Sequence, residues 1–143
     1  METVSKSETI PYSAKAMYSL VNDVESYPEF LPWCHAVQIH NQDEQEVTAS
    51  LTLSKGGINK SFTTRNELTP HSHMEMHLVE GPFKHLHGIW NFEEVDNGHC
   101  HVSVDITYDF NSRIMAMMLG PVFHHIADTL LKAFVTRAHE LHL

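Results

Sequence analysis

Residues 99–110 alternate strictly between apolar and polar side chains, and this pattern constrains the fold of the chain more than any other. Successive side chains of a β-strand point to opposite faces of the sheet, so the alternation predicts a strand with one buried and one hydrated face. Such a sheet requires a second layer of structure over its apolar face. The even-numbered positions predicted to face the interior are Cys100, Val102, Val104, Ile106, Tyr108 and Phe110.

The same period of two, interrupted by turn-forming residues, extends over the centre of the chain. The breaks carry residues that favour turns, as at Gly56-Gly57 and Thr69-Pro70, and short turns pair consecutive strands antiparallel. The segment 2–10, which ends before Pro11, predicts a further strand. The central strands are predicted over 33–40, 46–54, 58–68, 72–80, 84–95 and 99–110.

The last two strands also predict their own register. The apolar positions of both are even-numbered, and directly opposed residues of a sheet share a face. This favours a three-residue turn or a bulge at Asp96-Asn97-Gly98 over a two-residue hairpin. The resulting pairing places His85 opposite Asp109 and His101 opposite Glu93.

Two helical segments flank the central strands. Ser13 is a suitable N-cap for a helix over Ala14 to Val24. Residues 113–141 carry a wide apolar stripe at helical spacing, in which we expect a kink or a short break at Gly120-Pro121. A long helix held by the concave face of a curved antiparallel sheet makes the predicted fold α+β, of the helix-grip type. No linker or repeat divides the chain, so we expect one domain over residues 1–143.

The charge of the chain narrows the classes of partner. The net charge is −9, from 9 basic and 18 acidic residues, and no basic run is present, which argues against a DNA-binding protein. Cys34 and Cys100 form no metal-binding or redox motif, and the N-terminus shows no secretory or transit signal. We therefore expect reduced thiols and a cytoplasmic location, with peripheral contact at the inner membrane as an alternative.

One stretch of sequence resembles a known family. The segment from Pro11 to Cys34, and above all its block Tyr27-Pro28-Glu29-Phe30-Leu31-Pro32-Trp33-Cys34, is similar to the coenzyme Q-binding START-like family within the polyketide cyclase/START-like superfamily. Further similar blocks begin at Gly81-Pro82-Phe83-Lys84 and at Val122-Phe123. The resemblance implies a helix-grip fold around an apolar tunnel that binds ubiquinone or a related polyprenyl lipid, as a lipid chaperone supporting respiratory electron transfer.

The same resemblance leaves a second function open. One bacterial branch of the family, the ribosome association toxins, is described as binding the large ribosomal subunit, blocking subunit association and repressing translation. The sequence does not separate a lipid chaperone from a ribosome-binding regulator. It also leaves open the identity of the lipid, the oligomeric state, and whether the interior is hollow or filled.

An apolar ligand would contact the inward face of the sheet and the C-terminal helix. Methionines make such a surface adaptable, and Gly88 is expected to leave space on it. Thr64 and Asn66 are predicted on the same face, where a polar group can orient a quinone carbonyl. The predicted ligand contacts are Trp33, Phe62, Met74, Met76, Leu78, Leu86, Trp90, Phe92, Val104, Ile106, Tyr108, Met118, Phe123 and Ile126.

The aromatic and proline-rich segment after the first helix has two interpretations. It can act as a gate of the cavity or a membrane contact, or it can be a structural plug that seals the edge of the sheet. The predicted gate or membrane-contact residues are Tyr27, Pro28, Phe30, Leu31 and Pro32.

Catalytic and metal chemistry receive less support from the sequence. Among the 13 histidines, His85, His87, His99 and His101 fall on the predicted solvent face, so we expect exposed charge pairs and no metal site. No nucleophile motif such as G-x-S-x-G is present, and we expect no enzymatic activity and no cofactor. A cyclase-type enzyme would need a polar residue deep in the cavity, for which Asn66 or Tyr108 are the candidates.

Overall fold

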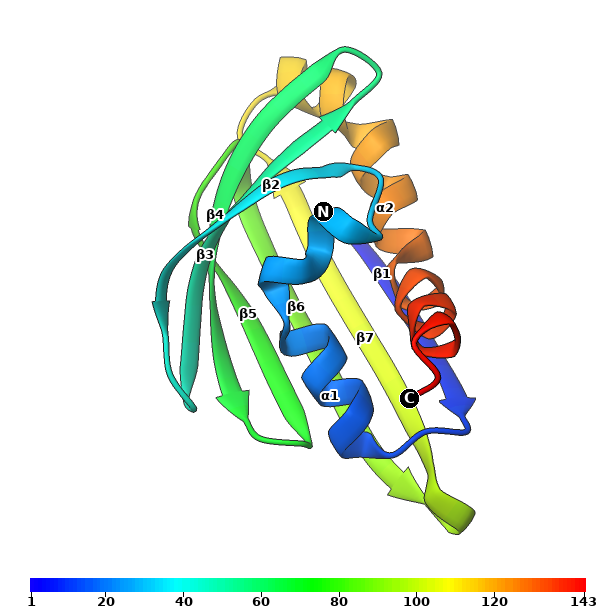
Figure 1. The fold of residues 1–143 in the computed structure, drawn as a ribbon. Helices are drawn as coiled ribbons and strands as arrows, with labels where there is room; N and C mark the ends of the chain where they lie inside the picture. The colour runs from blue at the N-terminus through cyan, green and yellow to red at the C-terminus, as the bar shows by residue number, and fades with distance from the viewer.

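A computed structural model describes all residues, 1–143, as one antiparallel sheet with helices on one side (Figure 1). The helical elements are α1 (Ala14–Asn22), the 3-10 segments η1 (Val24–Glu29) and η2 (Asp96–Gly98), and α2 (Arg113–Glu140). The strands are β1 (Glu2–Ile10), β2 (Cys34–Gln42), β3 (Glu46–Lys55), β4 (Ile58–Thr69), β5 (His73–Glu80), β6 (Phe83–Val95) and β7 (His99–Phe110).

The seven strands follow the order β1-β7-β6-β5-β4-β3-β2. Consecutive strands are neighbours throughout β2 to β7, as their short turns predict, and β1 returns to pair with β7. The sheet bends around the helices: α2 lies along the side of β1 and β7, and α1 covers part of β6 and β7 (Figure 1). This arrangement confirms the predicted α+β helix-grip fold.

The register between β6 and β7 is the predicted one. The three residues of η2 connect the strands, and Asn97 and Gly98 take positive φ angles of 62° and 74° there. Val95 therefore opposes His99, and the pairs His85–Asp109 and His101–Glu93 are opposed as expected. This register places the even-numbered, apolar positions of both strands on the same side of the sheet.

The core fills the space between the concave face of the sheet and the two helices. The inward side chains of β7 from Cys100 to Tyr108 are 0–4% exposed. The buried face of α1 contains Met17, Leu20 and Val21, and Val24 of η1 continues it, as the helical spacing predicts. The core therefore places one layer of apolar side chains from the sheet against another from the helices.

Of the kink or short break expected at Gly120-Pro121, the break is absent, because α2 continues from Arg113 to Glu140 through both residues. Pro121 lies on the exposed side of the helix, where water can bind the carbonyl left without an N–H donor. By length and composition α2 is apolar enough to cross a bilayer. Its inner face packs on β1 and β7, and 28% of its most apolar stretch is buried.

The N-cap of α1 is also the predicted one, since the Ser13 hydroxyl oxygen accepts a hydrogen bond from the Ala16 amide at 3.1 Å. Replacing Ser13 by alanine leaves that amide without its partner, so we expect the free energy of unfolding to fall by about 1 kcal/mol. Urea unfolding measures this change. The control Ser7→Ala, at an exposed position of β1, is expected to change stability by less than about 0.5 kcal/mol.

Candidate ligand-binding cavity

An apolar cavity of about 80 Å³ lies between the sheet and α2. Of the 18 side chains that line it, 16 are hydrophobic, and they come from the inward faces of β3 to β7, the inner face of α2, and the segment that joins α1 to β2. The lining residues are Val24, Tyr27, Trp33, Val47, Ala49, Leu51, Phe62, Thr64, Asn66, Met74, Met76, Trp90, Ile106, Phe123, Ile126, Ala127, Leu130 and Phe134.

The structure brings only part of the predicted ligand contacts to this cavity. Eight line it: Trp33, Phe62, Met74, Met76, Trp90, Ile106, Phe123 and Ile126. Four others are buried in the surrounding core without reaching the cavity: Leu86, Phe92, Val104 and Tyr108. Leu78 is half-buried and also lies outside the lining. Alternation identifies the inward face of a strand, but it does not tell which inward side chains border free space.

Met118 is the one predicted contact that lies on the surface. Its side chain is 46% exposed, whereas that of Leu119 is 2% exposed. One residue corresponds to about 100° of rotation in an α-helix, so the two side chains point to different sides of α2. The prediction that Met118 faces the interior is wrong, because the buried face of α2 runs through Leu119, Phe123 and Ile126.

Several lining residues were not predicted, although the sequence carries the patterns that identify them. Val47, Ala49 and Leu51 are alternate positions of β3 and are all buried, so the period of two applied to this strand identifies them. Ala49 and Ala127 are at most 2% exposed, and their small side chains help to leave the space free. The other missed residues, Val24, Leu130 and Phe134, lie on apolar helical faces.

Two polar side chains interrupt the apolar wall, and both were predicted to do so. Thr64 is 4% exposed and is the only buried polar residue of the chain. Asn66 contacts the sulfur of Met74 through its Nδ2 atom at 3.9 Å, while its buried Oδ1 atom has no hydrogen-bond partner. A buried polar group without a partner costs about 1–3 kcal/mol, so Asn66 is the position where a polar group of a ligand would be stabilised most.

The space expected beside Gly88 is not empty. Met76 opposes Gly88 across β5 and β6, and its Cε atom lies 3.0 Å from the position that a Cβ of residue 88 would take. The flexible thioether side chain thus fills the gap that the glycine leaves, which corrects the expectation drawn from the sequence. A ligand gains that space only if Met76 changes its rotamer.

Gly88→Ala is therefore expected to weaken ligand binding with little loss of stability. The added methyl group displaces the end of Met76, which is a flexible group, into the cavity that it lines. We expect the dissociation constant for a short-chain ubiquinone to rise several-fold while the unfolding midpoint in urea changes little. An unchanged dissociation constant would show that the space around Met76 is not used by the ligand.

The segment predicted as a gate packs against the C-terminal half of α2. The rings of Tyr27 and Phe30 each lie 5.4 Å from the ring of Phe134, edge to face. Arg137 of α2 lies over the Phe30 ring at 5.2 Å and forms an ion pair with Glu29 at 3.5 Å. These contacts hold the segment over the cavity, since Tyr27 also lines it.

Burial within this segment is uneven. Leu31 is 1% exposed, while Pro28 and Pro32 are exposed. The Tyr27 hydroxyl donates a hydrogen bond to the Val21 carbonyl, and burial raises the pKa of Tyr27. The inward side chains thus pack against the core, and Pro28 and Pro32 lie on the solvent side of the segment.

No activated nucleophile lies at this cavity. Burial raises the pKa of both thiols, Cys34 and Cys100, to about 11, so both are protonated at neutral pH. Tyr108 does not line the cavity, and its hydroxyl lies 3.3 Å from Nδ1 of His124 on α2. Of the two polar residues considered for cyclase chemistry, only Asn66 reaches the cavity.

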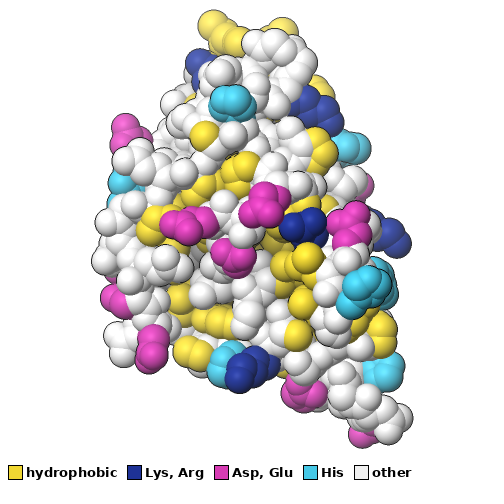
Figure 2. All heavy atoms as spheres, viewed as in Figure 1, with side chains coloured by type: hydrophobic (Ala, Val, Ile, Leu, Met, Phe, Trp, Pro, Cys, Tyr) yellow, Lys and Arg dark blue, Asp and Glu magenta, His cyan; other side chains and the backbone are white.

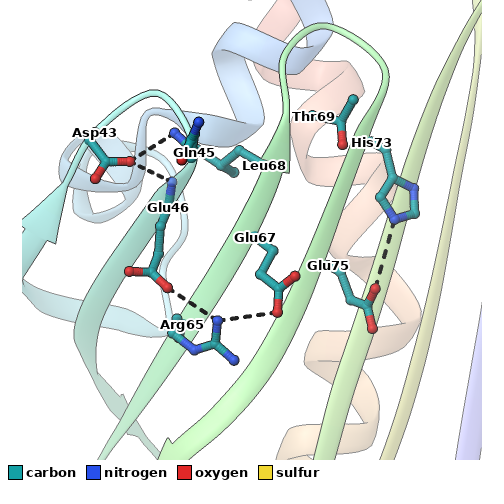
Figure 3. Close-up of a pocket in the computed structure, with 9 residues that line it drawn as sticks. All are labelled: Asp43, Gln45, Glu46, Arg65, Glu67, Leu68, Thr69, His73 and Glu75. Atoms are coloured by element: carbon teal, nitrogen blue, oxygen red, sulfur yellow. Dashed lines mark hydrogen bonds and ion pairs between the residues drawn. The ribbon is translucent and has the colours of Figure 1, made fainter.

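The opposite face of the sheet carries an open groove that is lined mainly by polar and charged side chains (Figure 3). Arg65 forms ion pairs with Glu46 and Glu67, each at 3.1 Å, and Asp43 and Glu75 add further carboxylates. Only Leu68 among its lining residues is hydrophobic, so this groove does not suit an apolar ligand.

Comparisons with known proteins agree with this architecture. The model of the family "Polyketide cyclase / dehydrase and lipid transport" matches residues 10–135. The Zhui aromatase/cyclase from Streptomyces sp. R1128 superposes with a TM-score of 0.84, covering 96% of this chain and 93% of that one. At 18% sequence identity, this likeness concerns the fold alone.

The sequence relatives include both a ribosome association toxin and a coenzyme Q-binding protein. The ribosome association toxin RatA of Pseudomonas aeruginosa is 42% identical, over 97% of this chain and 96% of its own length. The mitochondrial coenzyme Q-binding protein COQ10 of Drosophila melanogaster is 26% identical, over 92% of this chain and 56% of its own length. The chain therefore belongs to the polyketide cyclase/dehydrase and lipid transport family, in which it is similar to a RatA protein over nearly its full length.

Proposed function

We propose that this chain binds one molecule of a polyprenyl lipid, such as ubiquinone, in the cavity between the sheet and α2. The observation that carries the proposal is the unpartnered Oδ1 atom of Asn66 in an otherwise apolar cavity. The Nδ2 group of this amide contacts only the Met74 sulfur, at 3.9 Å, and can donate a hydrogen bond to a quinone carbonyl. Its Oδ1 atom can accept one only from a hydroxyl group, such as that of the reduced quinol. The apolar wall accepts the isoprene units. The lipid-transport description of the family and the name of the COQ10 relative support this choice.

Binding of a quinone requires the cavity to widen. Its volume of about 80 Å³ is roughly half that of the cavity of about 150 Å³ known to hold benzene. Met76 and Leu130 line the cavity and are only half-buried, so their side chains can move outward. A displacement of residues 24–33 from α2 would open a path for the tail, whose burial contributes about 25 cal/mol per Å².

The two tryptophans of the chain allow a direct test, because Trp33 and Trp90 both line the cavity. A quinone bound beside them should quench their emission. Titration with a short-chain ubiquinone is expected to give saturable quenching with one site per chain, and Trp33→Phe and Trp90→Phe should each remove part of the signal. Linear quenching that is the same in 8 M urea would reject binding in the cavity.

Ribosome association is the second candidate function, favoured by the 42% identity with a RatA protein over nearly the whole chain. In this proposal the chain acts in the cytoplasm, binds the large ribosomal subunit and represses translation by blocking subunit association. The net charge of −9, and the scattered basic side chains on the face in Figure 2, favour contact with basic ribosomal proteins over ribosomal RNA.

Sedimentation with purified large subunits tests the second candidate. We expect the chain to co-sediment at low salt and to be released as the salt concentration rises, because complementary charges are screened. Absence from the subunit fraction at every salt concentration would remove this function. The proposed lipid binding is independent of this outcome, since it uses the interior of the protein.

A further inference from the structure

The hydrated face of the sheet, opposite to the cavity, carries a group of imidazoles and carboxylates at the centre of β4, β5 and β6. His77 of β5 directly opposes His87 of β6, and Glu75 of β5 directly opposes Glu67 of β4. Residues 75 and 77 are two positions apart on one strand, so their side chains share a face. Figure 3 shows Glu67 and Glu75 on neighbouring strands of this face.

The donor atoms of this group are close together. His87 Nε2 lies 2.8 Å from a Glu75 oxygen, and His77 Nε2 lies 3.6 Å from the same oxygen. One ligand atom from each of these three residues lies within 4.8 Å of the other two. In a tetrahedral zinc site the ligand atoms are about 3.3 Å apart, so small rotamer changes of half-buried side chains bring the three to that spacing.

One donor of the group makes no well-formed hydrogen bond. The Nε2 atom of His77 is buried and contacts a Glu67 oxygen at 3.0 Å and a Glu75 oxygen at 3.6 Å, but neither contact has hydrogen-bond geometry. Glu67 is instead held by Arg65 at 3.1 Å. A buried ring nitrogen that points among carboxylate oxygens without a proper hydrogen bond is placed as a metal ligand would be.

The donor types favour a transition metal. Two imidazole nitrogens with one carboxylate suit Zn²⁺ and also Fe²⁺, whereas Mg²⁺ and Ca²⁺ prefer sets made of oxygen atoms. Zinc binds His nitrogen at about 2.0–2.1 Å and carboxylate oxygen at about 2.0–2.2 Å, and it takes four ligands. Three protein ligands leave the fourth position to a water molecule on this hydrated face.

We propose that Glu75, His77 and His87 bind a Zn²⁺ ion on the outer face of the sheet. The ion would join β5 to β6 and so stabilise the middle of the sheet from the side opposite to the cavity. The site is distinct from the proposed lipid site and does not depend on it. The sequence pattern did not reveal this site, because it predicts which histidines share a face of one strand, whereas His77 and His87 lie on the neighbouring strands β5 and β6.

The test is a zinc titration of the tag-free, metal-stripped full-length protein against a chromophoric chelator. We expect one saturable site, a higher unfolding midpoint with Zn²⁺ than without it, and no such increase with Mg²⁺. His77→Gln and His87→Gln are each expected to weaken zinc binding at least tenfold. His85→Gln is the matched control, since His85 lies on the same face of β6, outside the three-ligand group, and should leave the affinity unchanged.

The unfolding midpoints of the metal-free variants show whether each one is folded. Zinc binding that is absent in the unsubstituted protein would overturn the proposal and identify the group as an ion-pair network. Binding that survives both His77→Gln and His87→Gln, or that falls equally in His85→Gln, would also overturn it. None of these results would bear on lipid binding in the cavity.

Discussion

Replacing Ala127 by leucine is expected to weaken the binding of ubiquinone at least tenfold while the protein stays folded. Ala127 is 1% exposed, lies on the inner face of α2 and lines the cavity. Leucine adds three carbon atoms to a free volume of about 80 Å³, and it is a good helix former. We expect a loss of affinity of at least tenfold, which corresponds to about 1.4 kcal/mol, in the tryptophan-quenching titration.

The stability of the Ala127→Leu protein should change little, because the new side chain enters free space rather than a filled core. The control Ala133→Leu adds the same group to the same helix at a half-buried position outside the cavity lining, and it should bind ubiquinone normally. Equal affinity in both variants would contradict a ligand in this cavity. Ala127→Leu also separates the two proposed functions, because ribosome association should persist in it.

Replacing Phe134 by alanine is expected to lower the free energy of unfolding by about 3–5 kcal/mol. The Phe134 ring is 1% exposed and lies within 5.5 Å of the rings of Tyr27, Phe30 and Trp90. It therefore joins α2 to the segment 24–33 and to β6. Because Phe134 lines the cavity, removing its ring enlarges the cavity and weakens the contact between α2 and the segment 24–33.

Urea unfolding measures this effect, with Phe30→Ala as the comparison. Phe30 is only half-buried, so its truncation removes less buried surface and should cost clearly less than that of Phe134. A loss below about 1 kcal/mol in Phe134→Ala would contradict its role as the central contact between α2 and the segment 24–33.

Much of the fold is predictable because it depends on local periodicity. The alternation in residues 99–110 predicts β7 with its observed bounds. The apolar positions of β6 and β7 are both even-numbered, and this predicts the register between the two strands. Ser13 gives the start of α1. The continuity of α2 through Pro121 was not predictable in the same way, because it depends on which side of the helix faces water.

The candidate sites were less predictable, because they depend on distances between strands. Leu86 and Trp90 both point inward from β6, but only Trp90 borders the cavity. The space beside Gly88 is filled by Met76 from the neighbouring strand. His77 and His87 meet only through the register of β5 with β6, which the sequence pattern did not specify.

The most direct measurement is the lipid content of the protein purified, under conditions that retain bound lipid, from the cells that naturally produce it. Organic extraction followed by mass spectrometry should find close to one polyprenyl quinone per chain in the unsubstituted protein and almost none in Ala127→Leu. An unsubstituted protein without polyprenyl lipid, or an Ala127→Leu protein that carries the same amount, would contradict binding in the cavity.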